Sequence, residues 1–354
     1  MRFPVSERVA SACMAFANWP RRLLSDNLGR LALITALVFA GMSVAQPALF
    51  LTRANFSSMA FQFPEFALLG LAVMVSMLTG GIDLSVIGLA NLSSMLAVMA
   101  MRSLAADPHA PGAAPAIAVG IAALLGAGAL GGLLNGLAIA AIGIPPILAT
   151  LGTGLIFTGI AVVLSDGAAV LGFPDAISVL GNGALLGVPA PVLVFAALAA
   201  ALAFLLNWTS FGLRVYLLGT NALAARFAGI NNFRITLGAY LISGLLAAVA
   251  GLIIAVRANS AKADYGASYL LLSILISVLG GINPYGGFGK VSGLVLAVLS
   301  LQFLSSGLNL LQVSNFAVDM TWGALLLLVM VINTGGLRRP FGARVVRLIE
   351  RRKR

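Results

Sequence analysis

Apolar residues form long uninterrupted runs along this chain, separated by short polar or glycine-rich segments. A helix needs about 20 mostly apolar residues to cross the hydrocarbon core of a bilayer. The runs predicted to span are 31–51, 60–79, 84–101, 116–142, 147–164, 192–207, 236–256, 268–279, 291–308 and 316–333. They are continuous and rich in Ala, Leu and Gly instead of alternating with period two, which favours helices over a barrel. The predicted fold class is an all-α membrane protein, a polytopic bundle of about ten transmembrane helices.

Composition supports a chain that is almost entirely embedded in lipid. Hydrophobic residues make up 60% of the sequence and charged residues 9%. The polar intervals are too short for a soluble domain. We therefore expect an N-terminal segment (1–30), one membrane domain (31–334) with a polar loop at 208–235, and a basic tail (335–354). A second loop, 166–191, contains Gly and Pro residues that argue against continuous helix.

The basic residues predict the orientation, because short loops rich in Lys and Arg stay in the cytoplasm. With an even number of spans both termini lie on one side. Placing them inside leaves only four of the 21 basic residues outside, namely Arg53, Arg102, Arg257 and Lys262. Both termini and the loop 208–235 are therefore predicted to be cytoplasmic, in a multi-pass membrane protein.

The net charge of +11 does not require a nucleic acid partner, since most basic residues flank spans or lie in the two tails. Topology and contact with anionic lipid headgroups account for them, and no nucleic acid partner is expected. The single cysteine, Cys13, excludes an internal disulfide framework and a multi-cysteine metal site. The first thirty residues are polar and basic, so no cleavable secretion signal is predicted.

Two glycine-rich segments resemble each other. Residues 78–83 read Leu-Thr-Gly-Gly-Ile-Asp and residues 279–283 read Leu-Gly-Gly-Ile-Asn, each closing one apolar run before another opens. Paired glycine interruptions of this kind mark the transport pathway in many carriers, although Gly-Gly is also an ordinary turn signal. Gly128, Gly132 and Gly136 repeat at the four-residue spacing of a helix-packing seam. The packing or hinge candidates are Gly80, Gly81, Gly128, Gly132, Gly136, Gly280 and Gly281.

Asp83 lies between two apolar runs, where a charge is costly unless it faces water or protein partners. It is a functional candidate, and equally Asp83 or Ser85 can cap the helix that follows. Other polar residues beside or within the spans can hydrogen-bond a translocated solute or bridge two helices. The pathway candidates are Asp83, Ser85, Asn135, Thr150, Asn283 and Gln302. Glu65 and Asp319 lie near span ends, where we expect them to reach the membrane interface.

The loop 208–235 is the most informative polar segment. Asn221 can cap a short helix of small residues that ends at Gly229, giving a compact amphipathic element. Such an element either docks into a groove on a cytoplasmic partner or forms a solvated turn.

Several of these segments together resemble the permease subunits of ribose-type ABC sugar importers. The matching residues are 78–86, Asn135-Gly136, 144–153 with Pro145 and Pro146, 219–231, Gly280-Gly281 and 286–289, in collinear order from the first span to the last. Two positions depart from the family pattern. Ile87-Gly88 follow Val86 where a small Gly-Ser type step is usual, and Leu223 replaces a common Glu.

The resemblance implies a second permease copy, identical or a paralogue, a separate cytoplasmic ATPase, and a periplasmic binding protein that delivers a sugar or polyol. It adds Pro145 and Pro146 to the packing or hinge positions. It also identifies the ATPase-coupling residues as Gly219, Thr220, Asn221, Ala224, Ala225, Arg226, Gly229 and Ile230. ATP and Mg are expected on the partner ATPase, and no cofactor on this chain.

The chain's own residues agree with a non-enzymatic conduit. No complete phosphate-binding loop occurs, because Gly289-Lys290 is followed by Val291 and lacks the earlier glycine. One histidine, His109, cannot build a zinc site or a hydrolytic triad, so no metal and no catalytic residue are predicted. An ion-coupled secondary carrier that uses Asp83 is the alternative, and a membrane enzyme is a distant third hypothesis.

Overall fold

A computed structural model of the chain describes residues 27–104 and 113–333. Most of the predicted segment 1–30, the whole tail 335–354, and the residues Cys13 and His109 lie outside these ranges. The helices are α2 (Asn27–Ala45), α3 (Pro47–Phe50), α4 (Arg53–Leu78), α5 (Val86–Leu104), α6 (Ala114–Ala140), α7 (Pro146–Ser165), α8 (Asp175–Asn182), α9 (Ala190–Trp208), α10 (Ser210–Thr220), α11 (Ala222–Phe227), α12 (Asn232–Arg257), α13 (Tyr269–Leu279), α14 (Val291–Leu310) and α15 (Asn315–Asn333).

The all-α membrane class is confirmed. Within the described ranges, eight helices are long and apolar enough to cross a bilayer: α2, α4, α5, α6, α7, α9, α12 and α14. The shorter apolar helices α13 and α15 coincide with the two remaining predicted runs. The strands described are four two-residue pieces, β1 (Val170–Leu171), β2 (Ala184–Leu185), β3 (Val188–Pro189) and β4 (Ser260–Ala261). They pair antiparallel as β1 with β4 and β2 with β3.

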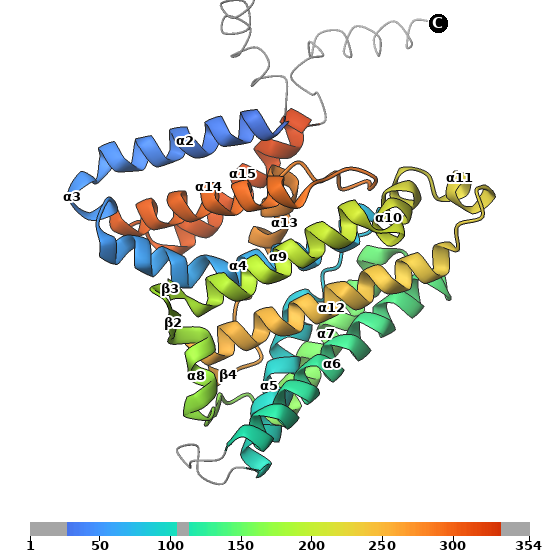
Figure 1. Ribbon diagram of the computed structural model, residues 1–354, viewed down its shortest axis with the longest axis horizontal. Coiled ribbons are helices and arrows are strands. Elements are labelled where there is room, and N and C mark those ends of the chain that lie inside the picture. The colour runs from blue at the N-terminus through green and yellow to red at the C-terminus, as the bar shows by residue number, and fades with distance from the viewer. Residues whose placement is uncertain (1–26, 105–112, 334–354) are drawn as a thin grey trace, which may run out of the picture.

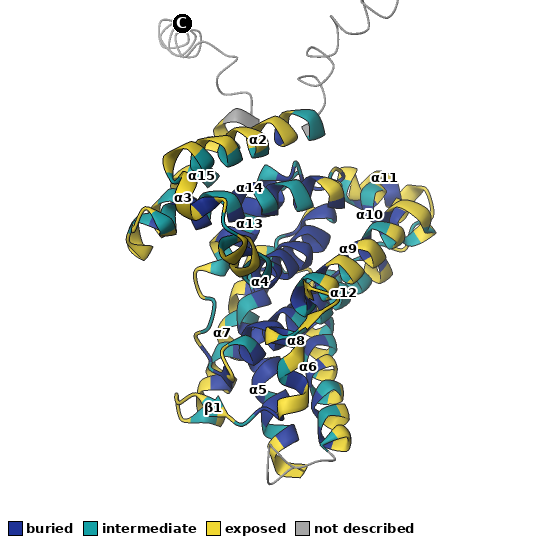
Figure 2. Cartoon of the chain, turned by 60° about the vertical axis from the view of Figure 1, so that its left-hand side comes forward, coloured by how far each residue is buried: buried dark blue, intermediate teal, exposed yellow. Residues whose placement is uncertain are grey.

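Helix α4 forms the centre of the bundle. In the most apolar stretch of α4, 83% of the residues are buried. In the corresponding stretch of α2, at the periphery, only 6% of the residues are buried. Figure 2 shows this contrast, with dark blue along α4 and α5 and yellow along α2. A central helix in lipid must be covered by other helices, and α9, α12, α13 and α14 all pack against α4. The segment that follows α4, residues 81–85, is accordingly buried or half-buried.

The connecting elements separate to opposite ends of the bundle. Helices α10 and α11 lie at one end, on the right of Figure 1, and α3, α8 and the β2–β3 hairpin lie at the other. The loop 208–235 and the loop 166–191 are thus on opposite faces, as the alternating spans require. We refer to the α10–α11 end as the inner end and to the other as the outer end, following the predicted orientation.

Helices α6 and α12 pack along the glycine repeat. A Cβ atom added to Gly128 would lie 2.6 Å from Ala248 Cβ and 2.7 Å from the Gly244 carbonyl oxygen. Gly132 faces the backbone of Tyr240, and Gly136 faces Leu237. Small residues allow such close approach of two backbones, which is the main source of helix association in lipid.

Candidate functional site

Both glycine-rich breaks end their helices with the same backbone motif. After α4, Gly80 N–H donates to the Met77 carbonyl and Gly81 N–H to the Ser76 carbonyl. After α13, Gly281 donates to Val278 and Ile282 to Ser277. The φ angles of Gly80 (+87°) and Gly281 (+82°) are left-handed, which is the conformation glycine supplies at the end of a helix. By these hydrogen bonds and φ angles, Gly80 corresponds to Gly281. An alignment that matches the two Gly-Gly pairs in the sequence would instead place Gly80 opposite Gly280, one residue away.

The first break leads directly into a buried polar network around Asp83. Asp83 and Ser85 are fully buried. Asp83 Oδ1 accepts hydrogen bonds from Ser85 N (3.0 Å) and Ser85 Oγ (2.7 Å). Asp83 Oδ2 accepts one from Ser243 Oγ on α12 at 2.8 Å. A carboxylate away from water requires such donors, so the network explains how Asp83 is accommodated.

The network continues onto α6 and α7. Asn135 Nδ2 donates to Ser85 Oγ (2.7 Å), and Thr153 Oγ1 donates to Asn135 Oδ1 (2.5 Å). Thr150 Oγ1 donates to the Ile82 carbonyl at 3.1 Å. Four of the six pathway candidates, Asp83, Ser85, Asn135 and Thr150, therefore converge on one buried cluster. In this conformation the cluster ties residues 79–85 to three helices.

Gly81 and Pro146 pack against each other beside this cluster. A Cβ atom on Gly81 would lie 2.5 Å from the Tyr240 hydroxyl and 2.9 Å from Pro146 Cβ. Pro145 and Pro146 open α7, where a missing N–H costs nothing. The packing candidates Gly81, Pro145 and Pro146 are thus placed together at the start of α7.

Asn283 and Gln302 lie apart from the Asp83 cluster. Asn283 belongs to the second break, where its Oδ1 accepts a hydrogen bond from Tyr285 N at 3.1 Å. Gln302 is buried on α14, in its outer half. Gly280 packs against the first turn of α14, where its added Cβ would lie 2.9 Å from Leu294 Cα. The six pathway candidates therefore occupy three places and not one.

At the inner end, the two breaks meet the end of α10 in a cluster of backbone contacts, which we call the glycine junction (Leu78, Gly80, Gly219, Gly286 and Gly287). Gly287 N–H donates to the Leu78 carbonyl at 3.1 Å. Gly219 lies directly against that carbonyl and against Gly287 N, with no room for a Cβ atom. A Cβ on Gly286 would meet Gly219 O at 2.7 Å and Gly80 N at 2.8 Å.

A side-chain contact strengthens the junction. Tyr216 Oη on α10 donates to the Gly289 carbonyl at 2.8 Å. Burial raises the pKa of Tyr216, so its hydroxyl keeps the proton that it donates. Helix α10 is thereby fixed to the segment between α13 and α14 as well as to the end of α4.

The segment after the junction forms the short helix expected from the sequence. Asn221 Oδ1 accepts from Leu223 N (3.0 Å) and Ala224 N (2.9 Å), which caps α11. Gly229, with φ of +79°, ends the turn that follows. Ala225 is buried against the protein, whereas Thr220, Ala224 and Arg226 are exposed and Ile230 is half-buried. Two large apolar side chains also point outward, since Leu223 is 64% exposed and Phe227 85% exposed.

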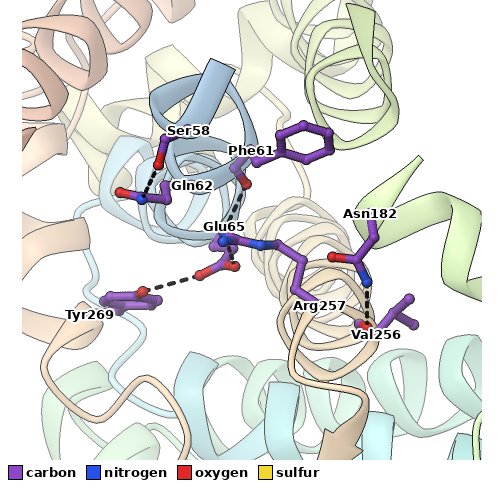
Figure 3. Close-up of polar contacts among 8 residues, drawn as sticks. All are labelled: Ser58, Phe61, Gln62, Glu65, Asn182, Val256, Arg257 and Tyr269. Carbon is purple, nitrogen blue, oxygen red and sulfur yellow. Dashed lines mark hydrogen bonds and ion pairs between the residues drawn. The ribbon is translucent and has the colours of Figure 1, made fainter. Parts of the chain in front are cut away.

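At the outer end, Glu65, Arg257 and Tyr269 form a polar cluster shown in Figure 3. Arg257 Nη1 donates to Glu65 Oε1 (2.6 Å) and to the Phe61 carbonyl (2.9 Å). Tyr269 Oη donates to Glu65 Oε2 at 3.0 Å. The expectation that Glu65 reaches the interface is wrong, because α12 and α13 bury it to 7% exposure. Asp319 is exposed, as expected.

This cluster borders a cavity of about 460 Å³, the outer cavity, between α4, α12, α13, α14 and α15. Its walls include Glu65, Arg257, Tyr269, Gln302 and Trp322. Sequence reasoning missed most of these residues, together with Ser243 and Thr153. Gln302 is a pathway candidate from the sequence alone, and Arg257, at the end of an apolar run, is a further signal that the orientation argument uses only for topology.

The fold and these sites define a polytopic membrane protein in which the segments after α4 and α13 contact helix α10 at the inner end. The chain matches the family of permease components of branched-chain amino acid transport systems over residues 55–332, and it belongs to that family. It is therefore a membrane transport permease.

Individual relatives carry more specific names. A ribose import permease protein of Bacillus subtilis is 34% identical over 296 residues, covering 82% of this chain and 88% of the relative. An autoinducer 2 import system permease protein of Yersinia enterocolitica is 33% identical over 288 residues, covering 79% and 84%. A D-allose transport system permease protein of Escherichia coli is 30% identical over 300 residues, covering 85% and 89%. No solved structure matches the chain with significant similarity.

Proposed function

We propose that this protein is the membrane-spanning permease subunit of an ATP-binding cassette importer for a sugar or related polyol. Relatives named for ribose and allose import support a sugar substrate, although the family's description names branched-chain amino acids. The same relatives favour an importer permease over an ion-coupled carrier that uses Asp83. In the proposed system a periplasmic binding protein delivers the sugar, and two permease copies form the pathway.

The observation that carries the proposal is the attachment of α10, which leads into α11, to the end of α4 and to the loop after α13. The glycine junction joins Gly219 to the end of α4 and to the loop between α13 and α14 through backbone atoms, without a flexible side chain between them. We infer that a displacement of α11 moves α10 and, through the glycine junction, the segment that follows α4 and holds Asp83. This arrangement supports the assignment of 219–230 as the ATPase-coupling segment.

Exposed apolar side chains on α11 support a protein partner at this end. Leu223 and Phe227 lie on one short helix beside Arg226 and point away from the bundle. Large apolar side chains gain free energy when a partner removes them from water. A cytoplasmic ATPase that covers these side chains would be such a partner. It would also carry the ATP and Mg, since this chain's sequence has no complete phosphate-binding loop.

Uptake and ATP hydrolysis measured on one reconstituted complex test the proposal. The permease is co-expressed with the ATPase and binding protein of its own gene cluster and placed in proteoliposomes with labelled D-ribose, D-allose or L-leucine. We expect sugar uptake that depends on ATP and is lost in Phe227→Asp. The control is Leu186→Asp, which changes a side chain that is 99% exposed at the opposite end. Leucine uptake, or sugar uptake that persists without the ATPase, would contradict the proposal.

A further inference from the structure

The outer cavity contains a buried amide group without a partner. Gln302 is 2% exposed, and neither its Nε2 nor its Oε1 atom has a hydrogen-bond partner. Proteins rarely leave a buried amide unpaired, because the group loses its hydrogen bonds to water without replacing them. Gln302 borders the cavity, so a rotation of its side chain toward the cavity would let a solute supply both a donor and an acceptor.

The one cation in the described cavity wall is already paired, and the wall also carries the exposed carboxylate of Asp319. Arg257 is the one cation among the described residues of the cavity wall, and it donates to Glu65 at 2.6 Å. Glu65 accepts a second hydrogen bond from Tyr269, which uses its other oxygen. A carboxylate solute would have to break this pair to obtain a cation, at the cost of leaving Glu65 uncompensated. A neutral solute makes no such demand.

The remaining walls suit a molecule with hydroxyl groups and an apolar face. Trp322 is 5% exposed and lines the cavity, and Phe66 and Leu272 add apolar surface. Ser305 and Asn309 on α14 supply further donors and acceptors. The volume of about 460 Å³ lies within the usual range for small-molecule sites, roughly 300–1,000 Å³.

We infer that the outer cavity is a binding subsite for a neutral polyhydroxylated solute, with Gln302 as its hydrogen-bonding residue and the Glu65–Arg257 pair as the element that rejects anions. The inference rests on the proposed function, since it names the place where the transported sugar first contacts this chain. It also predicts weak binding of amino acids, whose carboxylate finds no unpaired cation in the cavity wall described.

Direct binding to the permease tests the subsite separately from transport. The full chain carrying Trp19→Phe and Trp208→Phe retains Trp322 as its one tryptophan, so the fluorescence of that residue reports on the cavity. The protein is placed in nanodiscs without the binding protein and titrated with D-ribose, D-allose, sodium D-gluconate and L-leucine. We expect a saturable change with a neutral sugar and none with gluconate or leucine.

Two variants on one helix supply the comparison. Gln302→Ala should weaken sugar binding about tenfold, the size expected when two neutral hydrogen bonds are lost. Ser306→Ala, one turn along α14, removes a hydrogen bond to Asn55 outside the cavity and should leave the affinity unchanged. Equal loss in both variants would mean that Gln302 acts only through helix packing, and the inference would be wrong.

The outcomes separate this inference from the proposed function. No saturable response to either sugar, or an equal response to gluconate, overturns the subsite even when ATP-driven sugar uptake is normal. Uptake of leucine in place of sugar overturns the proposed function. Glu65→Gln with intact sugar binding and new gluconate binding would further support the role of the ion pair.

Discussion

Replacing Gly219 with alanine separates the effect of helix propensity from the effect of the glycine junction. Gly219 lies near the end of α10 with ordinary helical geometry. Propensity alone predicts that alanine stabilises the helix by up to about 1 kcal/mol. The structure predicts the opposite sign, because the new Cβ atom would overlap the Leu78 carbonyl oxygen and the Gly287 nitrogen.

The expected magnitude follows from the kind of atom that the methyl group meets. Both neighbours are backbone atoms, which cannot rotate away as a side chain can. Overpacking of this kind costs about 1–3 kcal/mol, which outweighs the propensity gain. With the full propensity gain subtracted, we expect a net destabilisation of the junction of up to about 2 kcal/mol, with a central value of about 1 kcal/mol. The central value corresponds to about a fivefold change in the population of the assembled junction.

The assay compares sugar transported with ATP hydrolysed in proteoliposomes. The Gly219→Ala complex should keep its basal ATPase activity and transport about fivefold less sugar per ATP, because the inner element is partly detached from the two helix breaks. Gly159→Ala on α7 is the matched control. Its Cβ atom meets nothing within 4 Å, so the variant should be neutral or slightly stabilised.

Wild-type coupling in Gly219→Ala, with unfolding no easier than in Gly159→Ala, would refute the reasoning. It would show that α10 can move away from the end of α4 and from the loop after α13 without a functional cost. The glycine junction would then be a packing detail.

Three further variants test other parts of the structure. Asp83→Asn should retain ATP-driven uptake, since the Ser243 hydroxyl can rotate to accept where it now donates. Loss of uptake in the variant, together with wild-type uptake that collapses with an ionophore, would instead favour the ion-coupled carrier. Arg257→Ala should destabilise the protein by about 2 kcal/mol in thermal unfolding. The cost is smaller than for a fully buried pair because the Arg257 side chain is 25% exposed. Adding Glu65→Gln should restore part of the lost stability, since no unpaired carboxylate then remains. Asn221→Ala should cost about 1 kcal/mol of α11 stability and lower uptake without removing the protein from the membrane, whereas an unchanged uptake rate would contradict a coupling role.

The sequence predicted the helices well because lipid makes a simple demand. Every backbone group within the hydrocarbon must be satisfied inside its own segment, so a long apolar run has few structures available other than a helix. Each predicted run corresponds to a helix in the structure, including the short α13 and α15. The cap at Asn221 and the helix ends at Gly80 and Gly281 were also readable, since they depend on neighbours within a few residues.

The sequence by itself did not determine which polar residues meet. Asp83 and Ser243 are 160 positions apart, and Glu65 and Arg257 are 192 apart, yet each pair is in hydrogen-bond contact. Their sequence neighbourhoods gave no sign of this, because hydropathy records whether a segment enters lipid and not which face of it meets another helix. Glu65 was misplaced at the interface for that reason.

Local chemistry therefore decided the class of protein, the helix ends and the short inner helix, all of which follow from interactions within one segment and its solvent. Only the tertiary structure decided the Asp83 cluster, the glycine junction and the outer cavity. These depend on the relative rotation of packed helices, which is fixed by close contacts such as those of Gly132 with Tyr240 and Gly219 with Leu78. Such contacts exist only when distant segments assemble, so no single stretch of the chain contains them.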